Sequence, residues 1–199
     1  MERRGAEFWY HSQVVEPSVT GGAVRGAVIE SKSGREAVLA DVVIDCTGDG
    51  DVAARAGVPF RVGRPVDGIC QPMTLMFEIS GLVDYVQRSA DELFDRMAAA
   101  VKEHDLGVEL PWGPDRHGTP WVIHIPRPGC AVVQATHVYR FDATDTRDLT
   151  RATVKARKQT WGLLEVLRRV PGLENVSLTQ TGPSIGIRET RHLEGRFRL

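Results

Sequence analysis

The sequence lacks most of the motifs that would identify a function at first sight. It contains no G-x-G-x-x-G motif, no phosphate-binding P-loop and no nucleophile elbow. It also has no internal repeat and no low-complexity segment. No local motif therefore indicates a standard dinucleotide fold, a P-loop nucleotide hydrolase or serine-type catalysis.

Cysteine is scarce, and neither sign of charge is in excess. The three cysteines, Cys46, Cys70 and Cys130, are an odd number at wide spacing, which favours neither a disulfide framework nor a C-x-x-C metal or iron–sulfur pattern. The chain has 25 Lys and Arg against 26 Asp and Glu, so a nucleic-acid partner is not indicated. The six histidines do not pair at metal-ligand spacing, and we expect no metal.

Long apolar runs are also missing. The longest uncharged apolar runs are far shorter than the roughly 20 residues that a membrane span needs. No apolar stretch follows the two arginines near Met1, so a signal peptide is not indicated. The 199 residues suffice to bury a core, since 42% of them are hydrophobic. We therefore expect a cytoplasmic protein with reduced thiols and no membrane contact.

The first part of the chain predicts a β-meander followed by a strand–turn–helix junction. We expect the three meander strands at residues 7–15, 23–31 and 36–40, with Gly21-Gly22 at the first turn. Residues 41–46 have the composition of a buried strand, and Thr47-Gly-Asp-Gly-Asp51 follows as a turn. A short helix then follows, with Asp51 as its N-cap and Gly57 just past its end.

The rest of the chain predicts further strands and two longer helices, which places the protein in the α/β class. Ser89-Ala-Asp-Glu92 has the pattern of a capping box before an amphipathic helix that ends near Gly107. Asp145 or Thr146 caps the longest predicted helix, which ends at Pro171-Gly172. The predicted strands are residues 74–79, 121–125, 131–141 and 175–181.

Two segments carry residues suited to ligand binding. Gly48 and Gly50 would let the backbone approach a ligand, and a helix N-terminus beside them offers N–H groups. The same residues are equally typical of a tight turn without a ligand. Arg188 and Arg191 would share one face of a helix and could clamp an anion, but on the residues alone a solvated charge cluster paired with Glu189 is the better explanation.

Five blocks, in a fixed order, extend over nearly the whole chain: Ala40–Gly57, Gln71–Phe77, Asp148–Ala152 with Arg157, Val170–Gly172 and Ile185–Arg191. Together they resemble bacterial FAD-dependent oxidoreductases related to the flavoprotein subunit of heterodisulfide reductase. Any one block would be weak evidence, whereas the five together form a specific match.

The resemblance implies a glutathione-reductase-like architecture. In such proteins an FAD domain, with a parallel sheet and a β-meander, is interrupted by a substrate domain. Residues 1–70 would then form part of a Rossmann-like FAD/NAD(P)-binding domain. Residues 71–181 would form a mixed α/β substrate (cap) domain, and residues 182–199 would return to the FAD-binding domain.

The resemblance also implies FAD as the cofactor and a set of site residues. The backbone of Val14 would lie beside the adenine, and the turn that begins at Thr47-Gly48 would close on the pyrophosphate and ribose. Arg188 and Arg191 are the candidate catalytic residues, for stabilising an anion or the flavin. The candidate cofactor-binding residues are Val14, Thr47, Gly48, Asp49, Gly50 and Asp51.

Two parts of the family pattern are not in this sequence: the opening βαβ unit with G-x-G-x-x-G, and a closing strand and helix that reach the flavin. We therefore expect an internal fragment of a flavoenzyme that binds FAD weakly or not at all on its own.

The main hypothesis is hydride transfer between FAD and a small-molecule substrate. A non-catalytic module, completed by another chain or a homo-oligomer, is an alternative. An iron–sulfur-linked electron-transfer flavoprotein is another, which the scattered cysteines disfavour.

Overall fold

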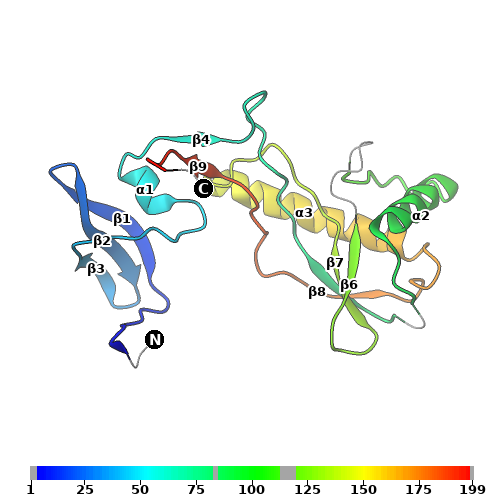
Figure 1. Cartoon of the computed structure of the whole chain (residues 1–199). Coiled ribbons are helices and arrows are strands. Elements are labelled where there is room, and N and C mark those ends of the chain that lie inside the picture. The colour runs from blue at the N-terminus through cyan, green and yellow to red at the C-terminus, as the bar shows by residue number, and fades with distance from the viewer. Residues whose placement is uncertain (1–3, 83–84, 113–119, 198–199) are drawn as a thin grey trace. The chain divides into compact units, whose positions relative to one another are not determined.

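The computed structural model describes residues 4–82, 85–112 and 120–197, and its chain divides into two compact units (Figure 1). Unit 1 comprises Met1–Gly63 and Arg191–Leu199, and unit 2 comprises Arg64–Thr190. The sequence placed the corresponding boundaries after residues 70 and 181. In both divisions the two ends of the chain belong to one unit and the middle belongs to the other.

Unit 1 contains the β-meander. Its strands are β1 (Gln13–Thr20), β2 (Ala23–Ser31) and β3 (Gly34–Leu39), in the order β1-β2-β3 and antiparallel throughout. The predicted topology is confirmed, but the first strand begins at Gln13 and not at residue 7. His11 has a left-handed backbone (φ 57°), which interrupts the extended conformation just before β1.

The remaining elements of unit 1 are the short helix α1 (Asp51–Arg55) and a two-stranded antiparallel ladder of β4 (Phe60–Val62) and β9 (Arg191–Leu193). Helix α1 packs against β1. Among the described residues of unit 1, just two large hydrophobic side chains are buried, those of Ile29 and Val52.

The predicted buried strand at residues 41–46 is wrong. The segment forms no strand, and the side chains of Val42 and Ile44 are 76% and 81% exposed. Its composition suits a strand covered on both faces, but no described strand lies alongside to pair with it. The expected parallel sheet is likewise not found, because every ladder among the described residues is antiparallel.

Unit 2 is built on a four-stranded antiparallel sheet. Two helices accompany it, α2 (Ala90–Glu103) and α3 (Thr146–Leu167). Ser89 caps α2 by accepting a hydrogen bond from Glu92 N, and Asp145 caps α3 by accepting one from Asp148 N. Both predicted helices are therefore confirmed. The four strands are β5 (Phe77–Ser80), β6 (Trp121–His124), β7 (Cys130–Gln134) and β8 (Ser177–Thr181), and their order in the sheet is β6-β7-β5-β8.

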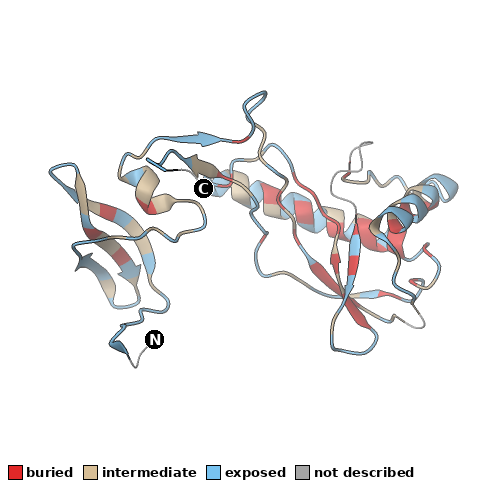
Figure 2. Ribbon diagram, viewed as in Figure 1, coloured by how far each residue is buried: buried red, intermediate tan, exposed pale blue. Residues whose placement is uncertain are grey.

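The main core of unit 2 lies between one face of this sheet and the two helices. Alternate strand residues, such as Phe77 and Ile79 on β5, pack with Leu93 and Met97 of α2 and Leu163 of α3. Figure 2 shows the buried residues gathered along α3 and on the strands. Helices thus combine with antiparallel sheets in the described chain, which is consistent with the predicted α/β class. No helix of the described residues is both long enough and apolar enough to span a bilayer.

Replacing Leu163 by Ala should lower the free energy of unfolding of unit 2 by about 3 kcal/mol, since the side chain is 1% exposed and its removal leaves a cavity. Trp161→Ala is the matched control on the same helix, because Trp161 is 61% exposed. Urea unfolding followed by circular dichroism measures both. A similar loss in the two variants would contradict the assigned core.

Candidate functional site

The turn at Thr47–Asp51 is organised by a carboxylate that precedes it. Asp45 Oδ1 accepts hydrogen bonds from the backbone N–H of Thr47 (2.9 Å) and from its hydroxyl (2.7 Å). Asp45 Oδ2 accepts one from Ala53 N, in the first turn of α1 (2.9 Å). One side chain therefore fixes both the entry to the turn and the start of the helix. Sequence reasoning assigned no role to Asp45.

The residues expected to bind the cofactor are partly used within the turn itself. The Thr47 hydroxyl donates to Asp45 and also accepts from Asp51 N (2.8 Å). The prediction that Asp51 is the N-cap of α1 is wrong. The N-cap is Gly50, and its left-handed φ of 62° suits glycine. Asp45 supplies the carboxylate cap from outside the helix instead. The side chains of the motif thus shape the turn.

Gly48 is the residue of the turn that remains open. It is exposed, and a Cβ placed on it would meet no other atom within 4 Å. Its φ is not in the left-handed region, so backbone strain does not require glycine here. A glycine that neither crowding nor conformation demands is consistent with close approach by a ligand.

The pKa of Asp45 is held below its ordinary value. Burial acts to raise this pKa, but the hydrogen bonds from the Thr47 hydroxyl and from the backbone N–H groups of Ala53, Thr47 and Val52 together outweigh it. The ionised carboxylate is thus the form that the turn stabilises. Its partners include the positive end of a helix, which favours a negative charge.

Arg191 holds the turn from the opposite end of the chain. Its Nη1 donates to the carbonyl oxygen of Asp49 and to Asp51 Oδ1, both at 2.9 Å. The side chain is 14% exposed, and its guanidinium lies over the ring of Phe60, 5.6 Å from the centroid. Arg191 was predicted to be catalytic; in the structure its guanidinium contacts the turn and the ring of Phe60.

Arg188 lies in a segment without helical structure. The helix face that it would share with Arg191, as considered above, therefore does not exist. Arg188 belongs to unit 2, where its Nε donates to Gln71 Oε1 (3.2 Å) and the neighbouring Glu189 accepts from Gln71 N (2.7 Å). Arg188 itself is exposed.

Val14 lies in the same unit as the turn. It pairs with Ile29 of β2, and the register shifts between Val14 and Glu16, as at a β-bulge. Strand β1 is an edge strand of its sheet. A bulged edge strand exposes backbone donors and acceptors that the ladder does not use.

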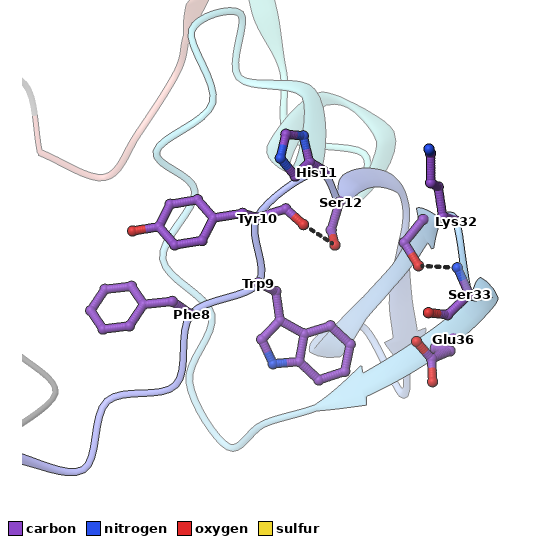
Figure 3. A pocket seen from close by; sticks show the side chains of 9 residues that line it. Phe8, Trp9, Tyr10, His11, Ser12, Lys32, Ser33 and Glu36 are labelled. Atoms are coloured by element: carbon purple, nitrogen blue, oxygen red, sulfur yellow. Dashed lines mark hydrogen bonds between the residues drawn. The ribbon is translucent and has the colours of Figure 1, made fainter.

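An aromatic hollow of about 640 Å³ lies at the start of β1. Phe8 and Tyr10 project from one side of the chain with nearly parallel rings, whose centroids are 6.2 Å apart (Figure 3). Trp9 projects from the other side, where Glu36 and Ser33 of the β2–β3 hairpin lie. Aromatic faces of this kind suit a planar ring. Sequence reasoning assigned these aromatics to a strand.

Metal or disulfide chemistry has no structural counterpart in the part of the chain that is described. No group of three His, Cys, Asp or Glu side chains converges there as a metal site would require. No disulfide joins Cys46, Cys70 and Cys130, of which Cys46 is exposed and Cys130 is buried.

Comparison with known families shows to which family the chain belongs. The model of the FAD dependent oxidoreductase family matches residues 1–199. The chain belongs to this family. FAD is therefore its cofactor, and its general chemistry is flavin-dependent oxidation and reduction. No curated protein and no solved structure gives a significant match to the chain.

The residues of this oxidoreductase fit FAD at two places. The open side of Gly48 would accept a group pressed against the backbone, and the bulged edge of β1 would accept a base through its main chain. The first amides of α1 are already bonded to Asp45 and Thr47, so they add no phosphate contacts. What these two places would offer to FAD is exposed backbone and not the carboxylates of the motif.

Replacing Asp45 by Asn should lower the free energy of unfolding of unit 1 by about 1–2 kcal/mol, because a charged acceptor of several hydrogen bonds is lost. This loss of unfolding free energy is in the lower part of the usual range for such bonds, since Asp45 is only partly buried. Asp41→Asn, at an exposed position of the same segment, is the control. Thermal unfolding measures both, and equal effects would contradict the anchoring role of Asp45.

The effect of Asp45 should also depend on pH. Since the folded-state pKa lies below the ordinary 3.8, the stabilisation is complete above that value and disappears as the pH falls through the folded pKa. The stability difference between the wild type and Asp45→Asn should therefore be constant near neutrality and shrink below about pH 4. A difference that grows in acid would contradict the assigned charge state.

Proposed function

We propose that this protein transfers a hydride between a small organic substrate and FAD, with unit 1 holding part of the FAD and unit 2 providing substrate contacts. The observation that carries the proposal is the turn at Thr47–Asp51, anchored by Asp45 and open at Gly48, in a chain matched over its whole length by the family. When bound, FAD supplies the two-electron chemistry at its isoalloxazine ring.

The protein's own residues then have separate tasks. Asp45 and Arg191 keep the turn in one shape, so the backbone at Gly48 can receive the pyrophosphate–ribose part of FAD without reorganising. The Val14 backbone receives the adenine, and Trp9 in the adjoining hollow offers it an aromatic face. Arg188, whose side chain is exposed, is proposed to stabilise negative charge on the substrate or the flavin.

A second candidate function is a binding module that another polypeptide completes. The exposed apolar side chains of Val42 and Ile44 favour it, since exposed apolar surface of this kind is a common feature of interaction sites. On this hypothesis the chain alone would show no saturable binding of FAD, whereas the main proposal requires binding that is saturable even if weak. Titration of FAD with the chain therefore distinguishes the two candidates.

Replacing Gly48 by Val should weaken FAD binding at least about tenfold, because the added methyl groups occupy the space proposed for the cofactor. Folding should be unaffected, since nothing lies within 4 Å of a Cβ at this position. The anisotropy of FAD fluorescence, titrated with the 199-residue chain, gives the affinity. Ala37→Val, at an exposed position on β3, is the control.

Two results of this titration would contradict the proposal. One is full affinity in Gly48→Val, which would remove the turn from the FAD site. The other is a wild-type chain without saturable binding, which would favour the second candidate.

Replacing Trp9 by Ala should weaken the binding of ADP several-fold, because adenine loses a stacking surface worth about 1 kcal/mol. ADP is the probe because it carries the adenine end of FAD without the flavin. Trp161→Ala removes an exposed tryptophan from unit 2 and should leave the affinity unchanged. Isothermal titration calorimetry measures all three proteins, and an unchanged affinity in Trp9→Ala would exclude the hollow from the adenine site.

A further inference from the structure

The helices α2 and α3 pack against one face of the four-stranded sheet in unit 2, and no described helix covers the other face. Residues that alternate with the core-facing Phe77 and Ile79 lie on it. The ladder pairs Ile123 with Val132, Val132 with Glu78, and Glu78 with Gln180, so these four residues form one row across the sheet. The outer members are exposed, Ile123 to 41%.

Glu78 is an exception to the apolar character of β5. The residue is only 6% exposed, although it lies on the face away from the helices. Its Oε1 accepts from Arg127 Nη2, and its Oε2 accepts from Gln180 Nε2 at 2.9 Å. Buried carboxylates are rare and contribute little net stability even when paired. Net stability alone therefore does not account for a carboxylate at this position.

A pocket of about 270 Å³ opens beside Glu78 on this face. Met76, Val132 and Pro183 provide its apolar lining. Its polar lining comes from Glu78 and Gln180. The volume lies just below the usual range for small-molecule sites, so the pocket suits a small ligand.

The polar groups of the pocket mainly accept hydrogen bonds. Each oxygen of Glu78 can accept one more hydrogen bond than it has, and Gln180 uses its amide nitrogen on Glu78, which leaves its amide oxygen as an acceptor. Thr181 pairs with Phe77, so its side chain lies on the helix-facing side of the sheet, where its hydroxyl accepts from Arg157 Nη1 (2.5 Å). Arg127 balances the charge of Glu78, so the pocket has no negative charge in excess to select a cation.

We propose that this pocket binds a neutral polyhydroxylated molecule of the sugar or polyol class. Its hydroxyl groups would donate to Glu78 and Gln180, and its C–H surfaces would pack on Met76, Val132 and Pro183. The identification of this ligand as the substrate oxidised by FAD rests on the proposed function. The binding itself does not.

The test uses methionine methyl NMR on the full 199-residue chain, titrated with D-glucose. The Met76 methyl reports on the pocket, and the Met97 methyl, buried on α2 at the other face of the sheet, is the internal control. We expect glucose to shift the Met76 signal saturably and the Met97 signal hardly at all. D-glucosamine and D-glucuronate, which add a positive or a negative charge, should bind at least about tenfold more weakly.

Two variants test the polar contacts. Gln180→Ala and Glu78→Gln should each weaken glucose binding at least about tenfold, whereas Gln134→Ala, on the same face but outside the pocket, should not. If Glu78→Gln misfolds, as a displaced Met97 signal would show, Gln180→Ala still decides. Gln180 is exposed, so its truncation should leave the fold intact.

The proposal is overturned if Met76 does not respond to glucose up to about 0.1 M, or if either charged sugar binds more tightly than glucose. It is also overturned if Gln180→Ala binds like the wild type. The experiment contains no flavin, so its failure leaves the FAD titration unaffected. If the FAD titration fails, the proposal that the pocket binds a polyol is likewise unaffected, and only its identification as the substrate site is lost.

Discussion

The carboxylate of Asp45 is the constraint on which the shape of unit 1 most depends. A five-residue helix such as α1 is too short to be stable alone, and the turn before it contains two glycines that favour an unfolded backbone. Asp45 opposes both tendencies because it accepts hydrogen bonds from Thr47 and from Ala53 across the turn. Arg191 adds a second anchor from the far end of the sequence. Local order in this unit thus comes from charge and hydrogen bonds more than from apolar packing, as its few buried side chains also indicate.

This arrangement changes the reading of the motif Thr47–Asp51. Its polar side chains suggested direct contact with a cofactor, yet the Thr47 hydroxyl and the Asp51 carboxylate are used within the protein. Gly48 has the opposite character, since nothing in the protein occupies the space beside it. A motif can therefore belong to a binding site even though most of its side chains never touch the ligand. In the proposed function their task is to hold a short piece of backbone rigid, which would lower the entropy lost on binding FAD.

The sequence predicted best those features that depend on local rules. Ser89 and Asp145 were recognisable as helix caps, and the spacing of apolar residues located α3, because capping and helical periodicity act within a few residues. Residues 41–46 show the limit of such reasoning: their composition is that of a buried strand, but a strand also needs a neighbour, and neighbours are decided by tertiary structure. The role of Asp45 was missed for the same reason. Its bond to Ala53 crosses eight residues and a left-handed glycine, a path that no capping pattern describes.

The sheet of unit 2 illustrates how one strand can serve two purposes. On β5, Phe77 and Ile79 complete the core with α2 and α3, and their burial fixes the register of the strand. That register in turn directs Glu78 to the other face, where Gln180 and Arg127 fix its carboxylate. The position of a polar group in the pocket is thus determined by apolar packing on the reverse side of the same strand. A shift of β5 by one residue in register would bury the charge of Glu78 in the core and expose two large hydrophobic side chains. The free energy that favours the core packing therefore also fixes the geometry of the pocket.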